Sequence, residues 1–290
     1  MDILQKFIKD NNYKKVSFQG AQGAWSHLAC AERLPEMEVV PCDDFETALA
    51  VVESGEVDLG MIPIDNSLAG RVADVHALLP KASLYIVGEH FLPIYHHLLG
   101  VKGAKIEDIK EVHSHVHALS QCRNILRQHH IKPVIGVDTA GSAKEIAARN
   151  DKSIGTIASK LAGDIYGLDS IKDNIADGDV NVTRFAILAR KPLPLEDLKN
   201  SQTKTSFLFK ARNIPSSLYK ALGGFATNGV NLTRIESYLH MAPTVEFWID
   251  AFGHPSQEHF DNAMDELTYF SDEVRVFGSY ERTSYAKDKM

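Results

Sequence analysis

The chain has 290 residues, of which 44% are hydrophobic, so it is long enough for about two domains with buried cores. The net charge of -7 argues against a general nucleic-acid binder, which would present a basic face. No apolar run approaches about 18 residues and the start does not read as a signal peptide, so we expect no membrane partner. Three scattered cysteines do not make a disulfide framework, and the cytoplasm is the expected location.

The first 190 residues alternate short strands with helices. Strands are predicted at 15–18, 39–40, 59–64, 84–91, 94–99, 111–112, 133–137, 153–157 and 181–188. Helices are predicted at 28–34, 44–52, 117–129, 142–148 and 159–166. Ser26 is the expected cap of the first of these helices. The alternation favours a mostly parallel, layered α/β fold.

A proline-rich, charged stretch at 191–197 is the predicted linker to a second domain. Beyond it the predicted elements follow the order strand, helix, strand, strand, helix, strand, at 205–211, 216–228, 232–239, 244–252, 256–269 and 274–278. This βαββαβ order is typical of a ferredoxin-like unit. We therefore expect domains at 1–190 and 203–280. The open sheet edge of such a unit favours pairing with another copy.

Polar residues gather where the predicted strands end, which is where open α/β sheets bind ligands. Several of these ends lead into helices, whose first-turn amides attract anions. Taken one at a time, each such residue is more typical of a helix cap than of a ligand site, but five such ends together with Thr183-Arg184 favour a site. The polar ends are Gln19-Gly20, Asp65-Asn66-Ser67, Ser114-His115, Asp138-Thr139-Ala140-Gly141-Ser142 and Thr156-Ile157-Ala158-Ser159.

Thr183-Arg184-Phe185 places a hydroxyl beside a guanidinium at the entry of a strand that must be largely buried. An unpaired buried polar group destabilises a protein by about 1–3 kcal/mol, and a ligand that carries a hydroxyl and carboxylates would offset this. Arg184 and Arg71 are candidates for binding carboxylates, although Arg71 is equally typical of a solvated loop cation.

Three other patterns are weak. His113, His115 and His117 alternate as metal ligands on a strand would, but no cysteine or carboxylate spacing completes a zinc set. Gly20-x-x-Gly23 lacks the full dinucleotide fingerprint. No nucleophile triad can be assembled from local signatures. We therefore expect neither a metal nor a cofactor.

Five of these segments, in this order over essentially the whole chain, resemble the prephenate dehydratase family. They are Phe18–Gly23, Pro63–Val72, Ser114–Cys122, Asp138–Ala140 and Thr183–Phe185. The chain departs from the family pattern at Ala21 (proline in the family), Asp65 (glutamate), Val116-His117 (Pro-Gln), Ser216-Ser217 (Gly-Ala) and Tyr238-Leu239 (Arg-Pro). Residues 217–222 and 231–237 resemble an ACT domain, the phenylalanine sensor of the family.

The resemblance implies a two-lobed, periplasmic-binding-protein-like catalytic domain followed by a ferredoxin-like ACT domain. It implies that prephenate loses its ring hydroxyl and ring carboxylate to give phenylpyruvate, and that Thr183 is the catalytic hydrogen-bond donor to the leaving oxygen. The implied substrate-binding residues are Asn66, Ser67, Ser114, His115, Thr139, Arg184, Phe185, Gln19 and Gly20.

The same resemblance implies that phenylalanine binds as an allosteric effector where two ACT domains meet, in a homodimer or homotetramer. Its implied contacts are Ser217, Leu218, Asn231, Leu232, Glu236 and Ser237. Two alternatives stay open at this point. One is an arogenate dehydratase, whose substrate has an amine where prephenate has a keto group, and the other is a non-catalytic amino-acid-sensing or solute-binding protein.

Overall fold

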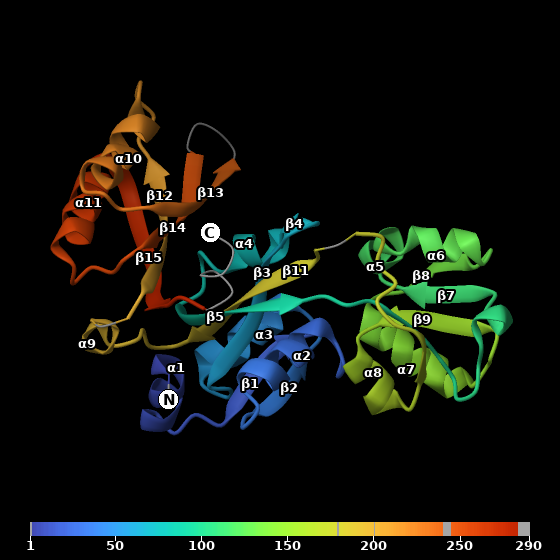
Figure 1. The fold of residues 1–290 in the computed structure, drawn as a ribbon. Coiled ribbons are helices and arrows are strands. Elements are labelled where there is room, and N and C mark those ends of the chain that lie inside the picture. The colour runs from blue at the N-terminus through green and yellow to red at the C-terminus, as the bar shows by residue number, and fades with distance from the viewer. Residues whose placement is uncertain (1, 179, 200, 240–244, 284–290) are drawn as a thin grey trace. The chain divides into compact units, whose positions relative to one another are not determined.

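The computed structural model describes residues 2–178, 180–199, 201–239 and 245–283 (Figure 1). The chain divides into two compact units. The larger unit comprises Lys14–Leu79 and His90–Phe185, and the smaller unit comprises the described residues of Met1–Tyr13, Pro80–Glu89 and Ala186–Met290. The division into domains at 1–190 and 203–280 stays a prediction.

The first sheet holds two predicted site segments at neighbouring strand ends. Its strands run in the order β2 (Glu38–Cys42), β1 (Lys15–Gln19), β3 (Leu59–Asn66), β11 (Val182–Ala189) and β5 (Tyr85–Pro93), with β4 (Gly70–Arg71) beside β3. Because β1 is parallel to β3, Gln19 and Asn66 end their strands at the same edge. Helices α2 (Trp25–Arg33), α3 (Phe45–Ser54) and α4 (Ala73–Leu78) follow β1, β2 and β4 along the chain.

The second sheet is mixed, whereas the sequence favoured mostly parallel pairing. Its order is β10 (Asp169–Lys172), β6 (His97–Gly100), β9 (Ile154–Ala158), β7 (Glu111–Ser114) and β8 (Lys132–Ile135). Strand β7 is parallel to β8 and β9, but β6 is antiparallel to β9 and β10. Figure 1 shows α5 (Val116–Gln121) and α6 (Arg123–Gln128) on one face, and α7 (Thr139–Arg149) and α8 (Lys160–Tyr166) on the other. Each face therefore has its own apolar core.

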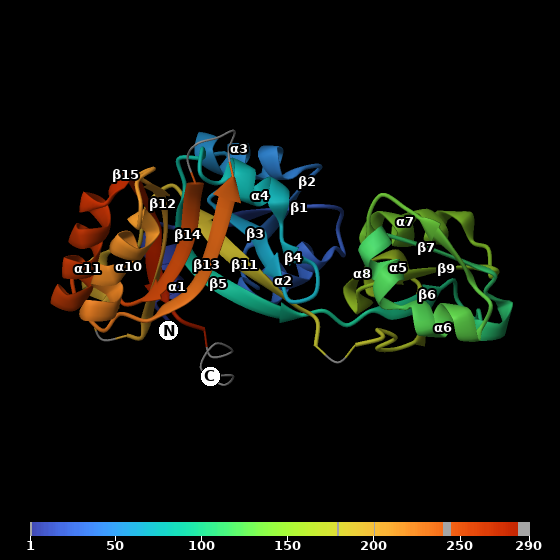
Figure 2. The ribbon, with the colours of Figure 1, turned by 90° about the horizontal axis from the view of Figure 1, so that it is seen from above.

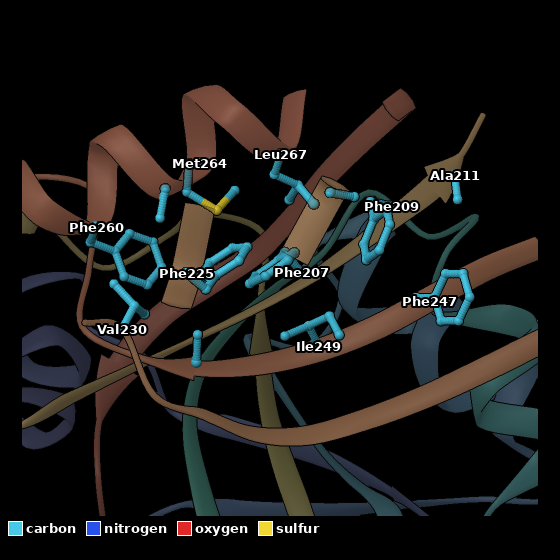
Figure 3. Close-up of a cluster of buried hydrophobic side chains, with 13 residues drawn as sticks. Phe207, Phe209, Ala211, Phe225, Val230, Phe247, Ile249, Phe260, Met264 and Leu267 are labelled. Carbon is cyan, nitrogen blue, oxygen red and sulfur yellow. The ribbon is translucent and has the colours of Figure 1, made fainter. Parts of the chain in front are cut away.

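The smaller unit contains the predicted βαββαβ succession. Its elements are β12 (Thr203–Ala211), α10 (Ser217–Thr227), β13 (Leu232–Leu239), β14 (Val245–Phe252), α11 (Glu258–Tyr269) and β15 (Ser271–Glu281). The antiparallel sheet has the order β13-β14-β12-β15, and α10 and α11 lie side by side on it (Figure 2). Alternate residues of the strands pack under both helices, with Phe207, Phe225 and Phe260 at the centre (Figure 3).

Two sequence predictions of local structure are wrong. The single helix expected at 117–129 is two helices, α5 and α6, broken at Cys122. The second helix starts there because the carboxylate of Asp177 accepts hydrogen bonds from the backbone N–H groups of Arg123 and Asn124, at 2.8 and 3.0 Å. Ser26 is not a cap, because α2 already begins at Trp25.

Other differences are smaller. The predicted linker contains a short helix, α9 (Leu195–Leu198), and the sequence patterns did not indicate α1 (Ile3–Asp10), α4, β4 or β10. Thr244, the predicted first residue of a hairpin strand, lies outside the described residues. Within the described ranges, no helix combines the length and apolar character needed to cross a membrane.

Candidate active site

A cavity of about 420 Å³ lies within the larger unit. Most of the predicted substrate-binding residues line it, although they come from segments far apart in the sequence. Ser67, Ser114 and Arg184 are outside its lining. The predicted residues that line it are Gln19, Gly20, Asn66, His115, Thr139, Thr183 and Phe185.

The glycine loop after β1 is held by the second sheet's helix α8. Ser159 Oγ donates a hydrogen bond to the carbonyl oxygen of Gly23 at 2.6 Å, and the Tyr166 hydroxyl donates to that of Gln22 at 2.8 Å. Gly23 has φ +86°, and a Cβ there would lie 2.7 Å from the Cα of Ala162. Only glycine therefore suits this position.

Asn66 has an orientation that its neighbours determine. Its side-chain oxygen accepts hydrogen bonds from the backbone N–H groups of Leu68 and Ala69, at 2.9 and 2.8 Å. A backbone N–H can only donate, so the amide nitrogen must point the other way. There it donates to Asn181 Oδ1 at 2.7 Å and to Thr183 Oγ1 at 3.0 Å.

Thr183 is thereby left as a hydrogen-bond donor. Its oxygen accepts from the Asn66 amide, and in the described part of the chain no second hydrogen-bond partner of this hydroxyl is found. Its own O–H must point away from an N–H donor. Since Thr183 lines the cavity, that proton is available to a bound molecule.

The hydrogen bonds continue from Asn181 to two residues that the sequence did not indicate as site residues. Asn181 Nδ2 donates to Gln121 Oε1 at 2.8 Å, and His96 Nε2 lies 2.7 Å from the same oxygen. His96 is only 3% exposed and lines the cavity. Gln121 falls inside a family-like segment, which is the one signal that pointed to it.

Arg184 lies on the opposite face of β11 from Thr183 and Phe185, as strand alternation requires. It is 7% exposed, and its Nη1 is 3.7 Å from Asp65 Oδ2. Asp65 Oδ1 in turn lies 3.6 Å from His76 Nε2. Arg184 thus lies beside Asp65 and outside the residues that line the cavity.

The two predicted serines make backbone hydrogen bonds. The buried Ser114 hydroxyl donates to the carbonyl oxygen of Ile157 at 2.6 Å. Ser67 Oγ accepts from the N–H of Val182 at 3.0 Å and lies 3.3 Å from the carbonyl oxygen of Val180. Ser67 thus holds the entry of β11, and Thr183 with it, against the end of β3.

Burial lowers the pKa of several histidines of the larger unit, and two of them, His96 and His115, line the cavity. It lowers the pKa of His27 and of His96, with Gln121 opposing the effect at His96. Burial also lowers the pKa of His115, nearby His117 adds to this, and Asp138 opposes it. The imidazole of His27 accepts a hydrogen bond from the Gly23 N–H at 2.9 Å, which requires its neutral form.

The alternating histidines do not lie on one strand face. His113 ends up in β7, His115 is the N-cap of α5 and His117 is in its first turn. Within the ranges that the structure describes, no three His, Cys, Asp or Glu side chains come together as metal ligands would.

A model of the prephenate dehydratase family matches residues 16–193. A bifunctional N-acyl-homoserine lactone acylase/prephenate dehydratase of Komagataeibacter europaeus is 40% identical over 279 residues, which cover 96% of this chain and 99% of the relative. Arogenate dehydratase/prephenate dehydratase 1, chloroplastic, of Arabidopsis thaliana is 38% identical over 289 residues, with 93% of this chain and 73% of the relative covered.

A solved structure is also similar. The prephenate dehydratase from Arthrobacter aurescens, in complex with L-Phe, has a TM-score of 0.84 and 30% sequence identity. The similarity covers 92% of this chain and 90% of the other.

Acidification from about pH 7.5 to about pH 5.5 is expected to lower the urea midpoint of unfolding. Burial holds the pKa of His27, His96 and His115 below its ordinary value in the folded state, whereas the unfolded chain titrates near 6.5. Below about pH 6.5 the unfolded state therefore binds more protons than the folded state. The free energy of unfolding then decreases as the pH is lowered. His27→Gln, which keeps an acceptor for Gly23, should reduce this pH dependence. A midpoint that rises on acidification would contradict the argument.

Proposed function

Since the chain belongs to the prephenate dehydratase family, we propose that it converts prephenate to phenylpyruvate, carbon dioxide and water. The observation that carries the proposal is the hydroxyl of Thr183, which lines the cavity while its oxygen accepts the hydrogen bond of Asn66. In the reaction the bond from the ring to its carboxylate breaks, and its electron pair enters the ring as the bond to the hydroxyl breaks. Aromatisation supplies the driving force.

The protein's task is to assist the departing hydroxide. An alcohol is a weak acid, so Thr183 acts by a directed hydrogen bond that strengthens as negative charge develops on the leaving oxygen. The Asn66 N–H that donates to the Thr183 oxygen keeps the threonine proton from turning back toward the protein. Hydroxide leaves and takes a proton from solvent to give water, so that Thr183 keeps its own proton.

Neutral donors orient the two carboxylates of the substrate. Gln121 presents its amide nitrogen, because its oxygen is occupied by Asn181 and His96. Thr139 lines the cavity in the first turn of α7, where the helix end favours anions. The aromatic side chains of Phe185 and Trp25 form an apolar wall for the developing ring.

Changing Thr183 to Ala should lower kcat by about 100- to 10,000-fold, the range that a positioned proton donor contributes. Thr183→Ser keeps the hydroxyl and should retain most of the activity. Phenylpyruvate formation from prephenate is the readout. Thr47→Ala removes an exposed threonine outside the cavity lining and serves as the control. Near-normal turnover by Thr183→Ala would remove the proposed role.

Arogenate is the second candidate substrate. The Arabidopsis thaliana relative carries both activities in its name, and Asp138, which lines the cavity, places a carboxylate where the ammonium of arogenate would be attracted. Comparing kcat/KM for the two substrates decides between them. Binding of prephenate without phenylpyruvate formation would instead favour the non-catalytic alternative.

The relative from Komagataeibacter europaeus adds a third activity to assay. Its name includes N-acyl-homoserine lactone acylase, and its alignment with this chain is nearly end to end. The apolar cavity residues Trp25, Phe45 and Ile94 suit an acyl chain. Release of homoserine lactone from an N-acyl-homoserine lactone is the direct test, and the same Thr183 variants show whether this cavity is used.

We propose further that the βαββαβ part of the smaller unit is an ACT domain that binds phenylalanine and lowers activity. Two observations support this: the Arthrobacter aurescens structure was solved in complex with L-Phe, and Ser217 has a buried hydroxyl with no partner among the described residues. The site would form between two copies, in a homodimer or homotetramer. Its residues begin α10 and lie on or just before β13: Ser217, Leu218, Asn231, Leu232, Glu236 and Ser237.

Calorimetry should show saturable phenylalanine binding at millimolar concentration. Glu236→Gln removes the charge placed near the ligand's ammonium group and should weaken binding several-fold. Thr227→Ala, at the other end of α10, is the matched control because the Thr227 hydroxyl bonds to Gly223, Gly224 and Asn228 and to none of the proposed ligand contacts in the described chain. The absence of binding heat in the unmodified protein would overturn the regulatory proposal. The cytoplasmic location stays a prediction.

A further inference from the structure

The inference below rests on the proposed role of Thr183 and concerns the far end of the hydrogen-bond chain that reaches it. The donors and acceptors in this series of hydrogen bonds can be assigned in one way only. The backbone N–H groups of Leu68 and Ala69 determine which way Asn66 faces, so its amide nitrogen donates to Asn181 Oδ1. Asn181 must then offer its nitrogen to Gln121, which must offer its oxygen.

His96 completes this order. Its Nε2 lies 2.7 Å from the Gln121 oxygen, and an oxygen that faces a ring nitrogen requires that nitrogen to carry a proton. The opposite tautomer would place two lone pairs against each other. Turning the Gln121 amide would not relieve this, because its nitrogen would then meet the donating nitrogen of Asn181.

We propose that His96 is a positioning residue for the dehydration. Its Nε2–H holds the Gln121 oxygen in place, which keeps the Gln121 amide nitrogen free for the substrate and the Asn181 amide in the orientation that Asn66 requires. Because Asn66 then donates to the Thr183 oxygen, the Thr183 proton stays directed at the leaving hydroxyl. His96 itself contacts neither Thr183 nor the reacting atoms.

The surroundings of His96 support this role over that of a core residue. The ring is 3% exposed, and within the described part of the chain Nδ1 has no hydrogen-bond partner, so its one polar contact is the link to Gln121. If this position served packing alone, both ring nitrogens would have hydrogen-bond partners, or an apolar residue would occupy it. The ring of Trp25 packs edge-to-face against the imidazole, with 5.6 Å between the ring centroids and 75° between the ring planes, and so restricts the orientation of the imidazole.

Two substitutions at His96 separate the hydrogen bond from the shape. His96→Phe keeps a planar ring without the donor and should lower kcat about tenfold or more, as loss of an orienting partner does elsewhere. His96→Gln can place an N–H at the Nε2 position and should recover most of that loss. His97→Gln is the matched control, since His97 is the next residue, is similarly buried, bonds to Asp173 and lies outside the cavity lining.

A double-mutant cycle with Thr183→Ala distinguishes positioning from general stability. If His96 acts through Thr183, then His96→Phe should lower kcat much less in the Thr183→Ala background than in the unmodified protein. Equal losses in both backgrounds would mean that His96 does not act through Thr183 and would overturn the inference. Near-normal turnover by Thr183→Ala would instead overturn the proposed role of Thr183, and an unmodified protein that forms no phenylpyruvate would overturn the proposed function, so the failures are distinguishable.

A measurement on the unmodified protein covers the case in which His96→Phe does not fold. Nuclear magnetic resonance of ¹⁵N-histidine-labelled protein reports the tautomer of each ring, and the His96 signal is the one absent from His96→Gln. The inference requires a proton on Nε2 and none on Nδ1 at neutral pH. A signal with the proton on Nδ1 would overturn it, whatever the variants show.

Discussion

The direction of one side-chain amide governs the chemistry of the cavity. Two backbone N–H groups, those of Leu68 and Ala69, bind the oxygen of Asn66 and so turn its nitrogen toward Thr183 and Asn181. Every polar group from there to His96 has its donor or acceptor role assigned by that constraint. A weakly acidic alcohol becomes useful because its oxygen is already bonded and its proton is not.

The fold supplies this constraint by joining segments that are distant in the sequence. The end of β3 and the start of β11 meet through Ser67, and the glycine loop after β1 is held by Ser159 and Tyr166. Strand alternation then sends Thr183 and Phe185 into the cavity and Arg184 to the opposite face of β11, next to Asp65. The guanidinium of Arg184 is thus kept out of the cavity lining, while the side chains of Asn66, Gln121 and Thr183 line the cavity.

Much of the cavity lining could be predicted from the sequence. Polar residues follow several predicted strands in succession, and a ligand site explains such a series better than separate helix caps do. Gln19, Asn66, Thr139 and Thr183 all reached the cavity as expected. Arg184 was expected to contact substrate, although the period of the strand already placed it opposite Thr183. His96 could not have been found in the same way, since its role arises from pairing with Gln121 across 25 residues. The helix break at Cys122 likewise depends on Asp177, 54 residues beyond Arg123.

Turnover of Asn66→Asp compared with Asn66→Ala tests the central claim most directly. An aspartate can accept from Leu68 and Ala69 as asparagine does, but its second oxygen is an acceptor, so it should capture the Thr183 proton. Asn66→Ala removes the amide and leaves that proton free. The account predicts that, at saturating prephenate, Asn66→Asp has a kcat about tenfold or more below that of Asn66→Ala. An Asn66→Asp protein that turns over as fast as Asn66→Ala would contradict it.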